Sequence, residues 1–325
     1  MELTFLGTSA GVPTRQRHNS GLALRRDGAW DLFDCGEATQ HQVMRTGLSL
    51  AKLRRVFISH LHGDHVFGIF GVISSRALQG ATTELTIYGP AGIEHMVRTV
   101  IGTCGVHVTF PLDFHEVGEI PDDGARVVDD DTETIDVLPL RHRVPSHAWW
   151  IREADRPGAF DVDAARSAGV VEGPDFGRLQ RGEQVSLADG STVRPDDVIG
   201  APRPGRVLVV AGDNSDPTHL LARTGGVPLL IHEATFTEAA VAHLGDDRGH
   251  STAARIAGAA EDAGVGNLVL THFSPRYSDG NDARFSIDNI RSEAAGRFSG
   301  GLHLAEDLSH FTVAVDGHLD PVAVP

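Results

Sequence analysis

The stretch Ser59-His60-Leu61-His62-Gly63-Asp64-His65 carries three imidazoles and one carboxylate within six consecutive positions. It directly follows the apolar run Val56-Phe57-Ile58, so it is expected to be a short loop that leaves a β-strand. His60 and His62 stand two positions apart, which lets both rings point to one side of an extended backbone and bind one cation. The sequence therefore predicts a metal site in this loop.

The second half of the same loop predicts a second cation. Gly63 can adopt a positive φ, which turns the chain and directs Asp64 and His65 to another position. In two-metal hydrolytic sites the ions lie roughly 3.5–4 Å apart, and imidazole with carboxylate ligands favours zinc over magnesium. The alternative is a chance cluster of surface histidines, since the chain has 18 histidines among 325 residues. Four ligands at this spacing directly after a strand favour the metal site.

A dinuclear site needs about seven protein ligands, so three more must come from other parts of the chain. Three candidates follow apolar runs: His142 after residues 135–140, Asp213 after 206–212, and His272 after 267–271. Layered α/β sheets collect their ligands in loops at the carboxyl ends of such strands. Each candidate taken alone could be a structural residue, but together they complete the set.

At this point the chain resembles the metallo-β-lactamase superfamily, whose His-x-His-x-Asp-His loop and later His, Asp and His supply a two-zinc site. Within that superfamily it is similar to the ribonuclease Z family, endonucleases that cut the 3′ trailer from precursor tRNA. The matching segments occur in the family's order between Leu3 and Tyr277: 5–13, 32–40, 142–146, 232–236, 250–252 and 271–277.

The resemblance implies an α/β fold, a four-layered αββα sandwich with mixed sheets, in one domain over residues 1–325. The apolar patterns agree with this, because short strands alternate with candidate helices and residues 21–33 predict an antiparallel hairpin. The helices are predicted at 37–46, 66–79, 92–101, 252–263 and 287–296. The two cysteines, Cys35 and Cys104, do not make a disulfide framework, and Cys35 is expected to pack beneath the metal loop.

Residues 152–205 lie between the strand predicted around Trp149-Trp150-Ile151 and the strand that leads to Asp213. They are rich in glycine, proline and charge, and by themselves they indicate a surface excursion without a stated role. The resemblance implies that they form the protruding exosite arm of ribonuclease Z, which holds the tRNA elbow. Turns such as Pro157-Gly158 and Gly173-Pro174 fall where the family's arm has them.

The resemblance also assigns the seven ligands to two ions, expected to be Zn²⁺, with Mn²⁺ or Fe²⁺ as alternatives. The ligand sets are His60, His62 and His142 for one ion, Asp64, His65 and His272 for the other, and Asp213 as the bridge. In the family, Asp64 also accepts the proton of the attacking water. Two cations lower the pKa of bound water toward roughly 7 and draw charge from the phosphoryl oxygens.

The leaving alkoxide needs a proton donor, and the family points to His250, with Glu233 to orient it. Other interpretations stay open. His250 precedes Ser251-Thr252 and an alanine-rich stretch, so it could simply be the residue before a helix cap. Glu233 could only hydrogen-bond a residue behind the ligands. Asp34 could hold a metal-bound imidazole or cap the turn at Gly36.

The charge of the chain argues mildly against a nucleic acid partner. It has 28 Lys plus Arg against 44 Asp plus Glu, a net charge of -16 that repels a polyanion at long range. Residues 152–205 are acidic too, with seven Arg, no Lys and ten Asp plus Glu. RNA binding must then depend on local cationic spots, because Arg offers bidentate phosphate contacts. The candidate substrate contacts are Arg15, Arg17, Pro157, Gly158, Arg276 and Tyr277, with packing as the alternative role of Tyr277. Other cationic spots are His18, Arg54, Arg55, Arg141 and Arg143.

Three segments depart from the family pattern. Asp213-Asn214 replaces the usual Asp-Thr, and Asn214 can still donate a hydrogen bond near the bridging carboxylate. The first loop, residues 15–20, is one residue longer, which affects RNA contacts more than the metals. Glu37-Ala38-Thr39 replaces Glu-Gly-Thr, a minor change at a helix start.

These observations predict a zinc-dependent endoribonuclease that removes the 3′ trailer from precursor tRNA by two-metal phosphodiester hydrolysis. One alternative is a general phosphodiesterase or another metal-dependent hydrolase with a small substrate. The other is a non-catalytic RNA-binding module, which the filled ligand positions disfavour. The chain starts at once with a predicted strand, and no apolar run approaches membrane-spanning length. We therefore expect a cytoplasmic protein without membrane contact, and the family's arm, which reaches a second subunit, implies a homodimer.

Overall fold

The structure is a computed structural model that describes residues 1–277 and 285–323. It divides into two compact units, one of Met1–Arg152 with Arg206–Pro325 and the other of Glu153–Gly205. The first unit contains both large sheets and all seven predicted metal ligands. Across the described residues, the helices are too short or too polar to cross a lipid bilayer.

One sheet of the first unit has eight strands in the order β17-β16-β1-β2-β3-β4-β5-β6. Its strands are β1 (Glu2–Gly7), β2 (Gly21–Arg26), β3 (Ala29–Phe33), β4 (Leu53–Phe57), β5 (Leu85–Pro90), β6 (Leu112–Val117), β16 (His310–Val313) and β17 (Leu319–Pro321). The strands from β3 to β6 are parallel, whereas β1, β2, β16 and β17 pair antiparallel. The hairpin predicted at 21–33 is confirmed, because β2 and β3 pair antiparallel.

The other sheet has seven strands in the order β15-β14-β13-β12-β9-β8-β7. Its strands are β7 (Ala125–Asp129), β8 (Glu133–Leu140), β9 (Ser146–Glu153), β12 (Val207–Ala211), β13 (Leu229–Glu233), β14 (Asn267–Thr271) and β15 (Gly301–Leu304). The strands from β12 to β15 are parallel, and β9 joins them antiparallel. Both sheets are therefore mixed, as predicted.

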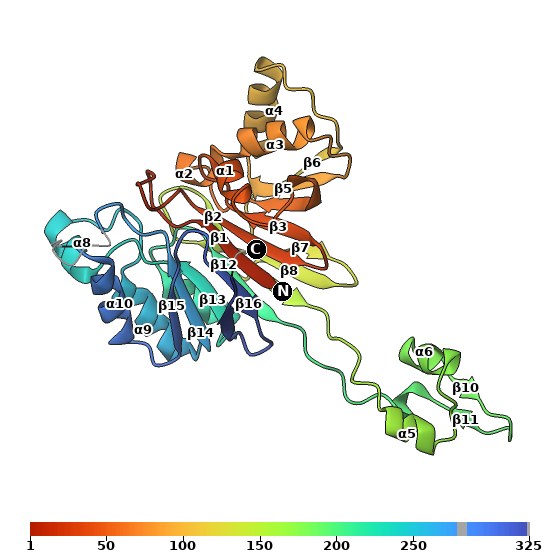
Figure 1. Ribbon diagram of the computed structural model, residues 1–325. Helices are drawn as coiled ribbons and strands as arrows, with labels where there is room; N and C mark the ends of the chain where they lie inside the picture. The colour runs from red at the N-terminus through yellow and green to blue at the C-terminus, as the bar shows by residue number, and fades with distance from the viewer. Residues whose placement is uncertain (278–284, 324–325) are drawn as a thin grey trace. The chain divides into compact units, whose positions relative to one another are not determined.

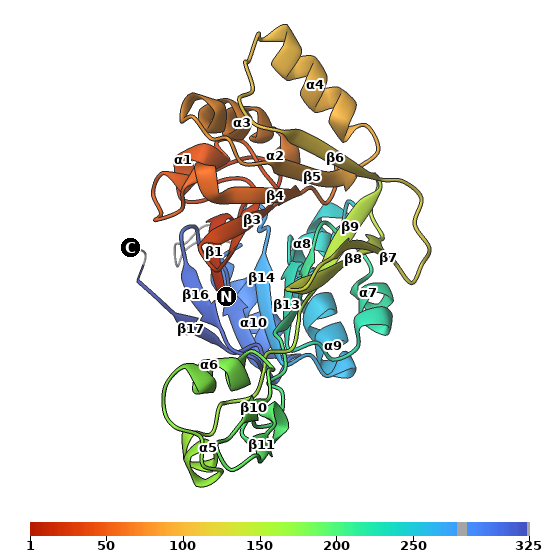
Figure 2. The same ribbon diagram turned by 90° about the vertical axis from the view of Figure 1, so that its right-hand side faces the viewer.

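Helices cover the outer face of each sheet in the first unit (Figure 1, Figure 2). Those beside the eight-stranded sheet are α1 (Thr39–Val43), α2 (Gly63–Val66), α3 (Ile69–Leu78) and α4 (Ile93–Thr103). Those that follow strands of the other sheet are α7 (Pro217–Thr224), α8 (Glu238–Leu244), α9 (Ala253–Ala263) and α10 (Ile287–Ala295). This arrangement confirms the four-layered αββα sandwich.

Three apolar cores separate these layers. Along β12, Leu208 and Val210 pack between the two sheets, while Val209 packs against the helices on the outer face. Along β4, Phe57 faces the other sheet and Val56 faces the α3 side. Because successive side chains of a strand point to opposite faces, strands that are apolar at every position have both faces buried. The continuous apolar runs in the sequence thus correspond to strands inside a layered fold.

The start of α1 differs from the prediction of a helix over 37–46. The helix begins at Thr39, because Ala38 has a φ of 63° in the left-handed region. A residue with a Cβ in this conformation costs roughly 1–2 kcal/mol, which glycine does not. The backbone at Ala38 is therefore strained, and the replacement of the family's glycine by alanine is not the minor change that the sequence indicated.

The second unit, Glu153–Gly205, has its own small core. It contains α5 (Val162–Ser167), α6 (Pro174–Gln180), β10 (Val185–Ser186) and β11 (Thr192–Val193). Its buried side chains are Ala165, Val170, Leu179, Val185, Val193 and Val198. Arg156 and Arg203 exchange backbone hydrogen bonds of 2.9 and 2.8 Å, which closes the base of this unit. At Gly158 a Cβ would lie 1.9 Å from the Gly200 carbonyl oxygen, so glycine is required there for packing within the unit.

Candidate metal centre and active-site cleft

The seven predicted ligands gather where several strands of both sheets end. His60 and His62 lie in the loop after β4, whereas Asp64 and His65 lie in α2. Gly63 begins this helix without a positive φ, so the helix directs these two ligands and the predicted glycine turn is wrong. His142 follows β8, Asp213 follows β12, and His272 follows β14 with a positive φ of 58°. Parallel strands bring their carboxyl ends to one edge, so residues far apart in the sequence meet there.

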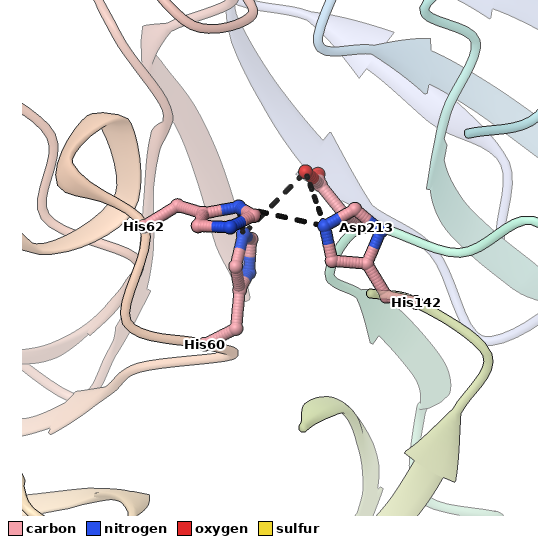
Figure 3. A group of neighbouring side chains, drawn as sticks. All are labelled: His60, His62, His142 and Asp213. Carbon is pink, nitrogen blue, oxygen red and sulfur yellow. Dashed lines mark hydrogen bonds and ion pairs between the residues drawn. The ribbon is translucent and has the colours of Figure 1, made fainter. Parts of the chain in front are cut away.

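The first ligand set consists of His60, His62, His142 and one oxygen of Asp213 (Figure 3). His60 Nε2 lies 3.0 Å from His62 Nδ1, and His142 Nε2 lies 3.4 Å from the same Nδ1. Asp213 Oδ2 lies 3.5 Å from His60 Nε2 and 3.8 Å from His142 Nε2. His62 thus presents Nδ1, whereas the other two rings present Nε2.

The second ligand set consists of Asp64, His65, His272 and the other oxygen of Asp213. His65 Nε2 and His272 Nε2 are 3.1 Å apart. Asp64 Oδ2 lies 3.4 Å from the His65 nitrogen and 3.3 Å from the His272 nitrogen. Asp213 Oδ1 lies at the same two distances from these nitrogens. Each carboxylate oxygen of Asp213 therefore faces one set, which is the arrangement of a bridging ligand.

These spacings fit two tetrahedral cations. Zinc bonds to nitrogen and oxygen are roughly 2.0–2.2 Å long, which places the ligand atoms of a tetrahedral ion roughly 3.3–3.5 Å apart. The pairs in the second set measure 3.1–3.4 Å, and those in the first set 3.0–3.8 Å. The donor set of imidazoles and carboxylates is one that zinc prefers. The cluster can bind metal.

The charge of the centre also favours cations. Burial alone would lower the pKa of His65, but Asp213, Asp34 and Asp64 outweigh burial and raise this pKa well above its usual range. Burial and the neighbouring His65 instead lower the pKa of His60, so His60 is neutral, the form that binds metal. The negative charge of these carboxylates thus stabilises positive charge placed among them.

Hydrogen bonds from the far side of each ring fix the ligand orientation. His142 Nδ1 donates to the Gly249 carbonyl at 2.7 Å, and His65 Nδ1 donates to Asp34 Oδ2 at 2.7 Å. Asp34 also accepts hydrogen bonds from the backbone nitrogen and hydroxyl of Ser59 at 2.7 and 2.9 Å. Such partners hold the tautomer and direction of a ligating ring. Of its two possible roles, Asp34 therefore takes that of holding an imidazole.

Glu233 is the centre of a buried network behind the ligands. Its carboxylate accepts hydrogen bonds from the backbone nitrogens of Asn214, Ser251 and Thr235 at 3.0–3.1 Å and from the Thr235 hydroxyl at 2.5 Å. His250 Nδ1 donates to the same carboxylate at 3.1 Å. Burial would lower the pKa of His250, but Glu233 and Asp213 raise it to about 9. Glu233 therefore orients the His250 ring, and its negative charge favours the protonated form.

The sequence of this chain is similar to those of several known proteins. A family model described as anti-Pycsar protein Apyc1 matches residues 1–101. Ribonuclease Z of Brevibacillus brevis is 42% identical over 320 residues, which cover 96% of this chain and 97% of that protein. Ribonuclease BN of Cronobacter sakazakii is 44% identical over 282 residues, 86% of this chain and 90% of that protein. The chain belongs to the ribonuclease Z family.

Solved structures share this fold. The short form of human tRNase Z has a TM-score of 0.68 and 25% sequence identity, with all of both chains covered. The metallo-β-lactamase fold protein YhfI from Bacillus subtilis has a TM-score of 0.63 and 22% identity, with 95% and 98% covered. The predicted superfamily and family are both confirmed.

A cleft of about 470 Å³ opens over the metal ligands of this ribonuclease Z family member. Its lining includes three arginines: Arg143, Arg248 and Arg276. The Arg276 guanidinium lies over the Phe236 ring, 5.4 Å from the ring centre. Arg248 was not among the predicted contacts, although its position two residues before His250 could have indicated it. The cleft of this acidic chain thus has three cationic side chains beside the carboxylates of Asp64 and Asp213.

The substrate contacts predicted for this ribonuclease Z family member include both exposed and buried residues. Arg15 is exposed, and Arg276 lines the cleft. Arg17 is buried, donates to the Thr8 hydroxyl at 3.0 Å and lies 5.1 Å from the centre of the Phe273 ring. The buried Tyr277 hydroxyl accepts a hydrogen bond from the Thr237 backbone nitrogen at 2.7 Å. The side chains of Arg17 and Tyr277 are therefore buried and form hydrogen bonds within the fold.

Cys35 is buried among the apolar residues beneath the metal loop, as expected. Its backbone nitrogen donates to the His65 carbonyl at 2.7 Å. Burial raises the pKa of the thiol to about 12, so a thiolate nucleophile does not form at neutral pH. Cys104 is also a free thiol, which confirms that the two cysteines make no disulfide.

Proposed function

We propose that this chain is the endoribonuclease that removes the 3′ trailer from precursor tRNA, with two Zn²⁺ ions per chain. The observation that carries the proposal is the division of seven ligands into two sets that share Asp213. The nearly full-length similarity to proteins named ribonuclease Z supports the choice of substrate. A small-substrate phosphodiesterase remains the second candidate, because the same ligand sets would serve it.

The chemistry requires a water molecule to attack a negatively charged phosphodiester. Cations bound by the two ligand sets would lower the pKa of a coordinated water to about 7 and offset the charge on the phosphoryl oxygens. The residues of the chain orient the reactants and carry the protons. The arginines that line the cleft, Arg143, Arg248 and Arg276, are placed to contact the flanking phosphates.

Asp64 and His250 divide the proton transfers between them. Asp64 takes the proton of the water as its oxygen forms a bond to phosphorus. The bond from phosphorus to the ribose 3′ oxygen breaks, and this oxygen takes a proton from His250 Nε2, because His250 Nδ1 is directed to Glu233. The products are a tRNA with a free 3′ hydroxyl and a trailer with a 5′ phosphate.

The direct test is incubation of the zinc-loaded protein with an end-labelled precursor tRNA that carries a 3′ trailer. Cleavage after the unpaired base that precedes the trailer is the expected result. Bis(p-nitrophenyl) phosphate serves as a parallel substrate for the metal centre alone. Hydrolysis of the small diester without tRNA cleavage would favour the phosphodiesterase.

His250→Ala is expected to affect the two substrates differently. General acid catalysis is worth roughly 10²–10⁴-fold, so tRNA cleavage should slow by that amount because the ribose oxygen is a poor leaving group without a proton. The p-nitrophenolate group leaves without protonation, so its release should change little. Single-turnover rates on both substrates measure the difference.

A matched control for this prediction is His95→Ala, which removes an exposed histidine of α4 that does not line the cleft. It should change neither rate. An equal loss on both substrates in His250→Ala would mean that His250 acts on the ligands and not on the leaving group.

We further propose that the second unit, Glu153–Gly205, is the exosite arm that binds the tRNA elbow. Replacing residues 157–202 by Asn-Gly would join Arg156 to Arg203 through a two-residue turn, because these residues already pair in antiparallel fashion. We expect the KM for precursor tRNA to rise at least roughly tenfold, or about 1.4 kcal/mol. Hydrolysis of the small diester should be unchanged. An unaltered KM for tRNA would remove the arm from the proposal.

The family resemblance also supports a cytoplasmic homodimer, which we propose as the working form. An arm that binds tRNA held at a second subunit needs two copies of the chain. Light scattering at micromolar concentration tests this directly, and a monomer at that concentration would count against it.

A further inference from the structure

Asn214, directly after the bridging Asp213, is fully buried at the back of the metal centre. Its side-chain nitrogen lies 3.0 Å from His232 Nε2. Its side-chain oxygen accepts hydrogen bonds from the backbone nitrogens of Arg141 and Asp216, each at 3.2 Å. The polar atoms of this buried amide are therefore all used.

The direction of each of these hydrogen bonds is determined by chemistry. His232 Nδ1 lies 2.7 Å from the Glu233 carbonyl oxygen, which can only accept, so Nδ1 carries the proton. His232 is buried and its pKa is lowered by that burial, so the ring is neutral and Nε2 is an acceptor. Asn214 Nδ2 must then donate, which leaves Oδ1 to accept from the two backbone nitrogens. One amide orientation and one tautomer satisfy every contact.

The backbone of Asn214 adds two more contacts. Its nitrogen donates to Glu233 Oε1 at 3.1 Å, and its carbonyl accepts from the Ser251 hydroxyl at 2.6 Å. Ser251 is the residue after His250, and Arg141 is the residue before His142. Asn214, itself the neighbour of Asp213, thus contacts Glu233 and the direct neighbours of His142 and His250.

We propose that Asn214 is a positioning residue that fixes the bridging carboxylate, His142 and the His250–Glu233 pair relative to one another. The inference deepens the proposed function, because it concerns the same site. Three loops, after β8, after β12 and before α9, meet the last residues of β13 at this one side chain and its backbone. A shift of any of them would move a metal ligand relative to the proton donor.

The residue type matters because the junction needs one donor and two accepting positions on a single flat group. Threonine, expected at this position from the family pattern, offers one hydroxyl, which can donate one hydrogen bond and accept another but presents both from a single oxygen. Aspartate has the same shape but cannot donate to a neutral His232. Leucine has a similar volume and removes all the side-chain contacts, leaving buried donors unpaired.

The test compares Asn214→Leu, Asn214→Ala and Asn214→Thr with Asn267→Leu as the matched control. Asn267 is also buried and donates to the Pro228 and Asp316 carbonyls at 3.1 and 3.2 Å, at the opposite end of β14. The readouts are kcat and KM on precursor tRNA and on bis(p-nitrophenyl) phosphate, zinc content, and the thermal unfolding midpoint.

We expect Asn214→Leu and Asn214→Ala to lower kcat on both substrates by about 10–100-fold, the usual effect of losing a residue that supports metal ligands. The KM for tRNA should not change, and Asn214→Thr should recover most of kcat. Asn267→Leu should lower the unfolding midpoint and leave kcat intact. If Asn214→Leu does not fold, Asn214→Ala decides the result.

A wild-type kcat in the Asn214 variants, with only a lowered unfolding midpoint, would overturn the inference, since it would assign Asn214 to stability alone. A different outcome of the same experiment would contradict the proposed function. If the wild-type protein hydrolyses the small diester but not tRNA, the substrate is wrong, and the diester kcat and zinc content of the variants still decide the role of Asn214.

Discussion

Asp64→Ala is expected to reduce cleavage of precursor tRNA by more than about 10⁴-fold, because it removes both a metal ligand and the proton acceptor of the water. Burial would raise the pKa of Asp64, but His65 and His272 hold it far below its usual range, so the side chain is a carboxylate at every working pH. Its Oδ2 also accepts a hydrogen bond of 2.6 Å from the Gly11 backbone nitrogen. Asp64 thus links the first loop to the metal centre.

Two further variants make this prediction specific. Asp64→Asn keeps an oxygen that can accept from Gly11 and contact a cation, but it is a far weaker base, so it should retain more zinc than Asp64→Ala while cleaving as slowly. Asp262→Ala removes an exposed carboxylate of α9 and should cleave like the wild type. Single-turnover rates and zinc content measure the outcome. Rapid cleavage by zinc-loaded Asp64→Asn would show that another group accepts the proton.

The ligands could be predicted from the sequence because their signals are local. His60, His62, Asp64 and His65 lie within six consecutive positions, and this spacing directly after an apolar strand already indicates a metal site. The later ligands needed one more step, since each had to be recognised as a single residue that follows an apolar run. Strand ends in a layered α/β fold meet at one edge, so the topology brought these residues together.

Contacts between distant segments could not be predicted in the same way. Arg17 belongs to a loop with several basic residues, but its guanidinium packs over Phe273 and donates to Thr8. Asp307 accepts from the His18 backbone nitrogen and the Thr8 hydroxyl at 2.6 and 2.7 Å, which fixes the same loop. The contacts with Phe273 and Asp307 join segments more than 250 residues apart, and no pattern within the loop carries that information.

The orientation of the His62 ring and the backbone strain at Ala38 also could not be predicted from the sequence. The ligand pattern does not specify which nitrogen of His62 faces the cations, and the structure presents Nδ1. The substitution of alanine at position 38 is visible in the sequence, but its cost depends on a backbone φ of 63°. The helices of Glu153–Gly205 were not predicted, because each is too short to carry a clear apolar period.

A buried charge cluster joins the two sheets of the first unit at the ends of strands opposite the metal ligands. Glu133, the first residue of β8, and Asp31 of β3 have side chains with no exposed surface. Both form ion pairs with Arg26, Arg54 and Arg55, including contacts of 2.9 Å from Arg54 to each carboxylate. Arg54 and Arg55, which the sequence indicated as cationic spots, thus form ion pairs within the fold.

Glu133→Ala is therefore expected to lower the free energy of unfolding by about 3–5 kcal/mol, the cost of breaking a buried ion pair by removing one partner. The loss arises because Arg26 and Arg55 stay buried while half of their counter-charge is gone. The matched control is Asp129→Ala, which breaks the exposed 2.9 Å pair with Arg126 on β7 and should cost less than about 1 kcal/mol.

Denaturant unfolding at fixed zinc concentration measures both variants, since bound metal adds to the apparent stability. Glu133→Gln separates charge from shape, because the amide keeps an oxygen for the arginines but carries no charge. It should lie between Glu133→Ala and the wild type. Equal stability of Glu133→Ala and Asp129→Ala would mean that water enters the cluster and solvates the arginines, so that the contact between the sheets depends on the apolar residues around Phe57 and Trp149 alone.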